Sequence, residues 1–298
     1  AQWWDTNWTK CRNITIANTG NTTLSKFPAY IDLKYYSDMQ PNYHDIRFIN
    51  TSCANSGSEL DFEIETYSTT SADVWVEIDN LPAAGTTIAV YYGNASAASG
   101  ENVNGTWVSS HKGVWHLSES TNAENQDSTS NSNNGIPQNS PLSITGKIGK
   151  ALNFNYGNKD GDGDKDKDKD KDKDKDKVGV NTLIELGTKD SLDLSTVNTP
   201  DWTISLWVKP DPEFANNEYP VMYAYGDYLA TVGLSSKEGN EVGLIENYLN
   251  DASGLYSENA LTTDAWNHVV VTRDDSKTKF YLNGNANGSG NSVDIDKD

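Results

Sequence analysis

The stretch D-V-W-V-E-I-D, at Asp73–Asp79, alternates apolar and polar side chains without a break. Val74, Val76 and Ile78 fall on one side of an extended chain, and Trp75 falls on the other side among acidic residues. Because successive side chains of a β-strand point to opposite faces, the pattern predicts a strand with one face in a core and the other toward solvent.

Similar short segments, separated by turn residues, occupy the chain on both sides of this strand. In the first third we expect strands at Arg12–Ala17, Ala29–Tyr36, Asp45–Asn50, Leu60–Thr66, Asp73–Asp79 and Thr86–Tyr92. Small and polar residues then fill positions 94–107, a composition typical of a domain boundary. We therefore predict a first β-sandwich domain at 1–98 and a linker at 99–112.

A second set of strand patterns follows the linker. We expect strands at Gly113–Leu117, Ala151–Asn155, Val178–Leu186, Trp202–Lys209, Val221–Leu234, Glu241–Glu246, Trp266–Arg273 and Thr278–Leu282. The polar D-D-S-K turn between the last two predicts a hairpin. No segment has a helical period longer than about ten residues. The sequence thus predicts an all-β chain of two tandem β-sandwich domains, the second at 113–298.

The charge of the chain excludes several classes of partner. Its 298 residues include 23 basic and 43 acidic side chains, for a net charge of −20. Phosphate binding requires clustered Lys and Arg, so the balance argues against nucleic acid and against an anionic membrane surface. No apolar run approaches the roughly 20 residues of a membrane-spanning helix.

Several features favour secretion to the cell surface. The sequence begins at Ala1 without Met, as expected of a mature secreted product or a trimmed chain. Cys11 and Cys53 are the two cysteines, and we expect a disulfide between them, with two buried thiols as the alternative. Asn-x-Ser/Thr sequons, which we expect to carry glycans, occur at Asn7, Asn13, Asn21, Asn50, Asn94, Asn104 and Asn287. Chance is the alternative explanation in a chain so rich in Asn, Ser and Thr.

Positions 158–177 interrupt the β pattern with an Asp-Lys repeat, which we interpret as a solvated loop insertion. The start of this run offers a calcium site as an alternative. Asn158, Asp160 and Asp162, followed by Gly163, match the opening of an EF-hand-type loop, whose oxygen ligands suit Ca²⁺. Lys169 stands where that loop needs a bidentate Glu, so the match ends there.

One carboxylate pattern is typical of catalysis. Glu59, Asp61 and Glu63 in E-L-D-F-E are similar to the E-x-D-x-E strand of laminarinase-type glycoside hydrolases. On a regular strand the outer two lie about 13 Å apart, wider than the roughly 5–5.5 Å of a retaining pair. The same alternation also fits a half-exposed strand, and the chain has no other catalytic motif of the common kinds. We therefore expect no enzyme activity.

Two family resemblances emerge from these motifs. Residues 1–98 resemble a secreted domain of unknown function (family 2341) found in bacterial and archaeal surface proteins. The matching segments are W-T-K-C-R-N-I-T-I (Trp8–Ile16), H-D-I-R-F (His44–Phe48), L-D-F-E-I-E (Leu60–Glu65), V-W-V-E-I (Val74–Ile78) and I-A-V-Y-Y-G-N (Ile88–Asn94). This resemblance accounts for E-L-D-F-E without catalysis.

The rest of the chain resembles the laminin-G-like, concanavalin-A-type jelly roll. The matching segments are G-V-W-H-L-S-E-S (Gly113–Ser120), D-S-T-S-N-S-N-N-G (Asp127–Gly135), G-K-A-L-N-F (Gly149–Phe154), W-T-I-S-L-W-V-K-P (Trp202–Pro210), W-N-H-V-V-V-T-R-D (Trp266–Asp274) and F-Y-L-N-G (Phe280–Gly284).

This second resemblance implies roles for several residues. It implies a calcium ion near Asp127, Asn131 and Asn134, and an Asn-rich turn without calcium is the equal alternative. It also implies that Trp266 and His268 pack in the core. The family continues beyond Y-L-N-G with further strands, so we expect a jelly roll that lacks its last strand. Either the chain is truncated, or a neighbouring copy supplies the strand.

Three functions remain open at this point. The first is a non-enzymatic surface subunit of an extracellular filament, sheath or coat that self-associates through β-strand or sandwich contacts. The alternative is a calcium-dependent carbohydrate-binding adhesin, with Tyr223, Tyr225, Tyr228 and Tyr248 as aromatic candidates for the sugar site. The last is a glycoside hydrolase that uses Glu59, Asp61 and Glu63. The sequence does not identify the ligand-binding residues.

Overall fold

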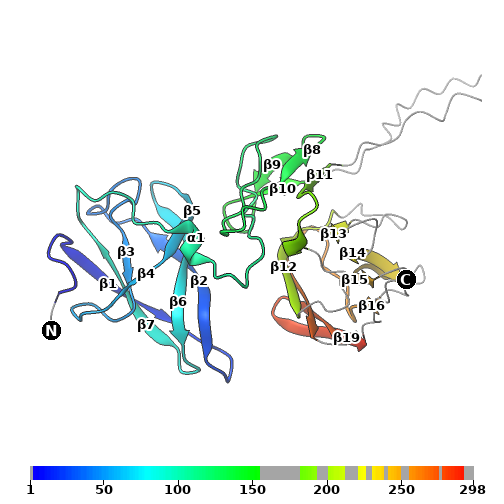
Figure 1. The fold of residues 1–298 in the computed structure, drawn as a ribbon, viewed down its shortest axis with the longest axis horizontal. Coiled ribbons are helices and arrows are strands. Elements are labelled where there is room, and N and C mark those ends of the chain that lie inside the picture. The colour runs from blue at the N-terminus through cyan, green and yellow to red at the C-terminus, as the bar shows by residue number, and fades with distance from the viewer. Residues whose placement is uncertain are drawn as a thin grey trace, which may run out of the picture. The chain divides into compact units, whose positions relative to one another are not determined.

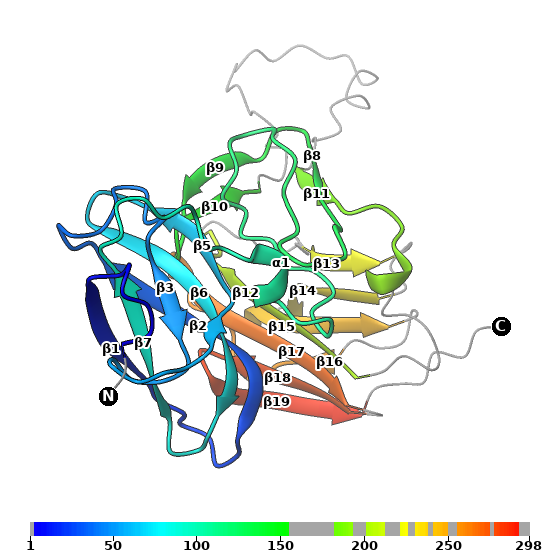
Figure 2. The ribbon, with the colours of Figure 1, turned by 60° about the vertical axis from the view of Figure 1, so that its left-hand side comes forward.

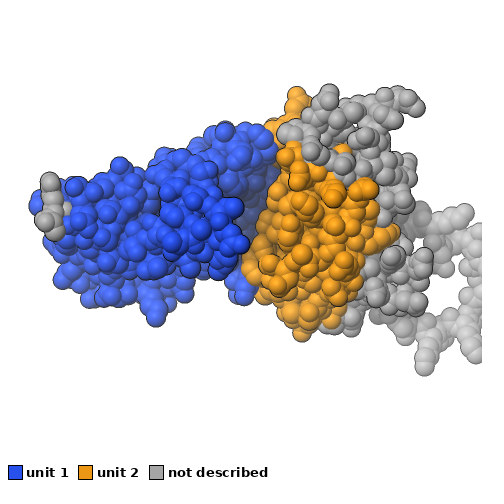
Figure 3. Space-filling model, turned by 90° about the horizontal axis from the view of Figure 1, so that it is seen from below, with its two compact units in different colours: residues 1–187 blue, residues 188–298 orange. Residues whose placement is uncertain are grey.

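A computed structural model describes residues 3–154, 182–192, 201–211, 221–225, 230–237, 241–249, 255–274 and 277–291. The chain divides into two compact units, residues 1–187 and 188–298, which Figure 3 colours separately. Nearly every element is a strand (Figure 1), as the alternation predicted. The Asp-Lys insertion at 158–177, with Asn158, Asp160 and Asp162, lies outside the described residues.

The first unit contains two antiparallel sheets. One has the order β1-β7-β3-β4 and consists of β1 (Lys10–Ile16), β7 (Thr86–Tyr92), β3 (Arg47–Ile49) and β4 (Glu59–Leu60). The other has the order β2-β6-β5 and consists of β2 (Leu24–Lys34), β6 (Ser71–Leu81) and β5 (Phe62–Tyr67). Their apolar faces share one core cluster, so the unit is a β-sandwich.

The predicted alternation at Asp73–Asp79 is confirmed in β6. Val74 and Val76 are fully buried and Ile78 is 2% exposed, while Trp75 lies on the other face of the sheet. Phe48 from β3 and Phe62 from β5 meet in this core with ring centroids 5.3 Å apart.

The strand predicted at Leu60–Thr66 is divided between the two sheets. β4 pairs with β3, with Phe48 opposite Leu60, whereas β5 pairs with β6, with Phe62 opposite Val76. The chain therefore passes from one sheet to the other at Asp61. Periodicity alone could not locate this crossing, because the alternation of side chains continues through it.

Several short elements follow the two sheets in the first unit. They are α1 (Val103–Thr106), β8 (Ile136–Gln138) paired with β11 (Leu183–Glu185), and β9 (Leu142–Thr145) paired with β10 (Lys150–Asn153). The predicted strand at Gly113–Leu117 does not form. The backbone N–H of Val114 there donates to the carboxylate of Asp127 at 3.0 Å, rather than to a sheet.

The second unit also contains two antiparallel sheets, after a short 3₁₀ turn η1 (Asp190–Leu192). The first sheet is β12 (Trp202–Val208), β17 (Asn267–Asp274), β18 (Lys277–Leu282) and β19 (Asn285–Asn291), side by side in that order (Figure 2). The second is β13 (Val221–Tyr225), β14 (Ala230–Lys237), β15 (Glu241–Leu249) and β16 (Leu255–Tyr256).

Both sheets contribute to the core of this unit. Ile245 of β15 and Val269, Val271 and Phe280 of β17 and β18 are fully buried in one cluster. The predicted hairpin at Trp266–Leu282 is confirmed by the pairing of β17 with β18. The single strand predicted at Val221–Leu234 is two paired strands, β13 and β14. The predicted absence of a final strand concerns positions beyond 291, outside the described part of the chain.

Candidate functional site

Glu63 of β5 lies at the centre of a buried polar network in the first unit. The residue is 7% exposed, and both of its carboxylate oxygens accept hydrogen bonds. Oε1 accepts from Ser128 Oγ at 2.6 Å, and Oε2 accepts from the indole of Trp107 at 2.6 Å. The Nε2 atom of His116 lies 3.1 Å from the same Oε2. Three residues from beyond position 106 thus converge on one carboxylate of the sandwich.

His116 bridges two glutamates of the same strand. Its Nδ1 atom lies 3.1 Å from Oε2 of Glu65, which also accepts from the indole of Trp75 at 2.8 Å. Burial by itself would lower the pKa of His116, but the hydrogen bonds and charges of Glu63 and Glu65 outweigh it and raise that pKa to about 9. The imidazole is therefore a cation at neutral pH.

The local pairing of β5 places both glutamates beside His116. Glu63 stands opposite Trp75, but an irregularity between Ile64 and Thr66 puts Thr66, not Glu65, opposite Asp73. Such a bulge re-aims the side chains around it. It is therefore consistent with Glu63 and Glu65 both contacting one imidazole.

The three carboxylates predicted for catalysis do not form one constellation. Glu59 on β4 pairs with Arg47, with 3.1 Å between Oε1 and Nε. Asp61, at the crossing between the sheets, accepts from the side-chain amide of Asn102 at 2.9 Å. Each of the three acids has a separate partner, and they are divided between two sheets.

The protonation state of Glu63 also argues against acid catalysis. Burial would raise its pKa, but the hydrogen bonds from His116, Ser128 and Trp107 together lower it. A general acid for glycoside hydrolysis needs a raised pKa and access to the leaving-group oxygen. Glu63 has a lowered pKa and is 7% exposed, so it does not fit the role of a general acid.

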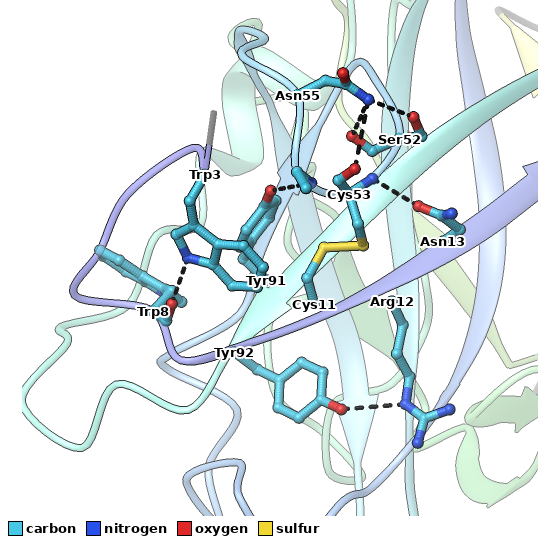
Figure 4. The surroundings of a disulfide bond; sticks show 11 residues. Trp3, Trp8, Cys11, Arg12, Asn13, Ser52, Cys53, Asn55, Tyr91 and Tyr92 are labelled. Carbon is cyan, nitrogen blue, oxygen red and sulfur yellow. Dashed lines mark hydrogen bonds between the residues drawn. A yellow bond between two sulfur atoms is a disulfide. The ribbon is translucent and has the colours of Figure 1, made fainter. Parts of the chain in front are cut away.

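The predicted disulfide between Cys11 and Cys53 is confirmed (Figure 4). It joins β1 to the loop after β3, where the backbone N–H of Cys53 donates to Asn13 Oδ1 at 2.7 Å. Trp3 packs beside it against Tyr91, with ring centroids 5.0 Å apart. The indole of Trp3 donates to the carbonyl of Trp8 at 2.7 Å, so the N-terminal segment covers this part of the sheet.

Asp127 organises its loop and has no lone pair left for a cation. Its Oδ1 accepts from the backbone N–H groups of Val114 and Thr129, and its Oδ2 accepts from Thr129 Oγ1 and the N–H of Asn133. A carboxylate offers about four lone-pair sites, and all are used here.

The two asparagines predicted to bind calcium with Asp127 also make hydrogen bonds. Asn131 donates to the carbonyl of His111 at 3.0 Å, and Oδ1 of Asn134 accepts from the N–H of Asp127 at 3.0 Å. The hydrogen bonds to Asp127 and Asn134 fit the Asn-rich turn rather than a calcium site at these two residues. Across the described ranges, no group of three or more His, Cys, Asp or Glu side chains is placed to hold a metal ion.

The predicted glycosylation sites differ in accessibility. Asn7, Asn13, Asn21, Asn50 and Asn104 are exposed, and Asn94 is partly exposed. Asn287 is only 2% exposed, and its amide nitrogen donates to the carbonyl of Asn259 at 2.9 Å. Its burial makes Asn287 a poor glycan acceptor in the folded unit.

The predicted tyrosine platform for sugar is not supported where it is described. Tyr223 packs against the core of the second unit, and its hydroxyl donates to the carbonyl of Leu192. The side chains of Tyr225 and Tyr248, and all of Tyr228, lie outside the described residues. Trp266 is partly buried, and His268 contacts the indole of Trp207 with ring centroids 5.0 Å apart.

Two family models match the chain in the order that the motifs suggested. The model described as the concanavalin A-like lectin/glucanases superfamily matches residues 186–297, which covers β12 to β19. The model described as a domain of unknown function (DUF2341) matches residues 42–130. The chain therefore carries a DUF2341 region followed by a concanavalin A-like domain.

The DUF2341 match includes the network around Glu63. Ser128, Trp107 and His116 lie inside the matched range, beyond the boundary predicted at 98. The division into compact units falls later still, between residues 187 and 188. The side chains that contact Glu63 thus join the segment after residue 106 to the first sandwich.

The comparisons with individual proteins add little. No curated protein matches the chain. A crystal structure of a Bacteroides ovatus protein, provisionally described as carbohydrate binding, aligns at 10% identity with a TM-score of 0.28. The alignment covers 96% of this chain but 65% of that protein, so this chain spans less than two thirds of its length. No argument about fold or function rests on so low a score.

Proposed function

We propose that this chain is a secreted, non-enzymatic surface protein that binds carbohydrate through its second unit. The observation that carries the proposal is the lectin/glucanase superfamily match over residues 186–297, which coincides with the two-sheet sandwich of β12 to β19. A fold by itself does not determine function, and this superfamily contains both lectins and glucanases. What favours binding over hydrolysis is the state of the one carboxylate motif that resembled a hydrolase strand, which lies in the first unit.

The state of the acidic residues favours binding over hydrolysis. The motif that resembled a hydrolase strand is divided between two sheets, and Glu63 is held charged by His116, Ser128 and Trp107. A retaining or inverting glycosidase needs two carboxyl groups on either side of one glycosidic bond. Glu59, Asp61 and Glu63 have separate partners and do not meet this requirement.

Secretion is supported by the covalent structure. Disulfides persist in oxidising compartments such as the outside of the cell, and Cys11–Cys53 is such a bond. Within the described residues, no helix has the length and apolarity to cross a membrane. Assembly into a filament, sheath or coat stays a prediction, as does a role for calcium.

A glycan array tests the proposal. The full chain is applied at neutral pH in calcium and again in chelator, and retained glycans are then incubated with the protein and analysed for new reducing ends. We expect retention of at least one glycan class and no new reducing ends. Silence of the array under both conditions overturns carbohydrate binding, and release of reducing ends overturns the non-enzymatic assignment.

A further inference from the structure

The outer face of the sheet β12-β17-β18-β19 carries an exposed tryptophan. Along β12, Trp202, Ile204, Leu206 and Val208 contact the core cluster of the unit. Side chains alternate along a strand, so Ser205 and Trp207 lie on the opposite face. Trp207 is 40% exposed, whereas Trp202 is 9% exposed. The exposed part of the indole offers an apolar ring surface to a ligand.

Polar hydrogen-bonding groups stand next to this indole. His268 is the cross-strand partner of Trp207, with the two ring centroids 5.0 Å apart at an interplanar angle of 33°. Ser205 Oγ lies 2.9 Å from Nε2 of His268. An apolar ring surface therefore borders a hydroxyl and an imidazole.

A second aromatic residue extends the same face. Ser205 pairs with Val270 on β17, and Val270 pairs with Tyr281 on β18, so the three occupy one row across the sheet. Tyr281 is partly buried. The row of Trp207 and His268 lies directly beside it, because Ser205 and Trp207 are two residues apart on one strand.

Two ion pairs lie at this face. Lys209 pairs with Asp264 at 2.7 Å, and Lys279 pairs with Asp274 at 3.3 Å. Burial lowers the pKa of His268, which favours its neutral form. A chain of net charge −20 repels polyanions over its surface as a whole. The face is therefore suited to an uncharged ligand rather than to an anionic one.

We propose that the outer face around Trp207, Ser205 and His268 binds neutral oligosaccharides, with a sugar ring stacked on the indole. Sugar rings present apolar C–H faces bordered by hydroxyls, which matches an aromatic surface flanked by a few hydrogen-bonding groups. This inference rests on the proposed function, and it adds the position of the site and the charge class of the ligand.

The test compares three variants with the wild-type chain on one glycan array. The array carries the neutral hexasaccharides cellohexaose, laminarihexaose and mannohexaose, and heparin and hyaluronan as anionic comparators. Trp207→Ala removes the stacking surface, and Ser205→Val removes the hydroxyl. Tyr30→Ala is the matched control, because Tyr30 is also 40% exposed on an outer sheet face, but in the first unit. Thermal melting confirms that each variant is folded.

We expect wild type and Tyr30→Ala to retain the same neutral hexasaccharide and to leave the anionic glycans unbound. Trp207→Ala should bind at least about tenfold more weakly and Ser205→Val several-fold more weakly, as lost stacking and a lost hydrogen bond imply. Wild-type binding that Trp207→Ala leaves unchanged overturns this site but not the proposed function. Preferential retention of heparin overturns the neutral class, and a wild type that binds nothing overturns the proposed function itself.

Discussion

Glu63 and His116 are 53 residues apart in the chain, yet Glu63 Oε2 and His116 Nε2 lie 3.1 Å apart in a buried ion pair. The pair joins β5 of the first sandwich to a segment that forms no strand of its own between residues 113 and 117. If the segment moved away, Glu63 and His116 would each be left as an uncompensated buried charge, which is strongly destabilising. The ion pair therefore holds the segment beside β5.

The stability of the first unit should fall as the pH rises through about 9. The pKa of His116 is raised from its ordinary 6.5 to about 9. A pKa raised by folding stabilises the folded state fully below pH 6.5, and this contribution is lost as the pH passes the folded value. The loss is on the order of 3 kcal/mol at most. Glu63 and Glu65 are the charged groups that face the imidazole.

Two measurements check this prediction. An NMR titration of the His116 imidazole should give a midpoint near pH 9, and the urea midpoint of the wild type should fall between pH 7 and pH 10. In the His116→Gln variant the urea midpoint should be lower at pH 7 and should change less over the same range. A His116 titration near pH 6.5 would contradict the buried ion pair.

Tyr43→Phe should leave the protein as stable as the wild type or stabilise it by about 1 kcal/mol. Tyr43 is fully buried, and its hydroxyl has no hydrogen-bond partner among the described residues. Tyr91→Phe is the matched control, because Tyr91 is equally buried but its hydroxyl accepts from the N–H of Ala54 at 3.1 Å. That variant should lose about 1 kcal/mol in urea denaturation. Equal losses for both would indicate that Tyr43 has a partner, such as an internal water.

The disulfide should stabilise the first unit by about 4 kcal/mol, because it closes a loop of 42 residues in the unfolded chain. The double variant Cys11→Ser/Cys53→Ser should therefore unfold at a markedly lower urea concentration than the oxidised wild type. Adding a reductant should bring the wild type close to the variant and leave the variant unchanged. If the reductant destabilised both proteins equally, the effect would not come from this bond.

Asp127→Ala should destabilise its loop by at least about 2 kcal/mol, because four hydrogen bonds to the carboxylate are lost. The same loss should appear in millimolar calcium and in chelator, because the carboxylate has no lone pair left for a cation. Thermal melts of wild type and variant under both conditions measure it. A wild-type melting temperature that rises with calcium, and does so only when Asp127 is present, would restore the calcium site.

The sequence predicted the sandwich class because the core faces follow a simple period. Val74, Val76 and Ile78 alternate in the sequence and are buried in the structure. The disulfide could be predicted because the chain contains only two cysteines, which allow one intramolecular pairing. The crossing at Asp61 was missed because a change of sheet does not alter the alternation of side chains along the chain.

The network of Glu63 was beyond prediction for a different reason. Its partners Trp107, His116 and Ser128 come from positions 44, 53 and 65 residues away, and no local spacing marks such pairs. Glu63 was singled out for a catalytic motif, and only its contacts reveal a structural role. Trp207 was quoted as part of a fold motif, and its exposure became apparent only when the two faces of β12 could be told apart.

Proton NMR of the best array ligand, mixed with the full chain, tests most directly whether the protein holds a sugar without cleaving it. We predict broadened ligand resonances, which report binding, and an anomeric region that stays unchanged after prolonged incubation. Sharp resonances at every protein concentration, or new anomeric signals from a shortened oligosaccharide, would contradict the account.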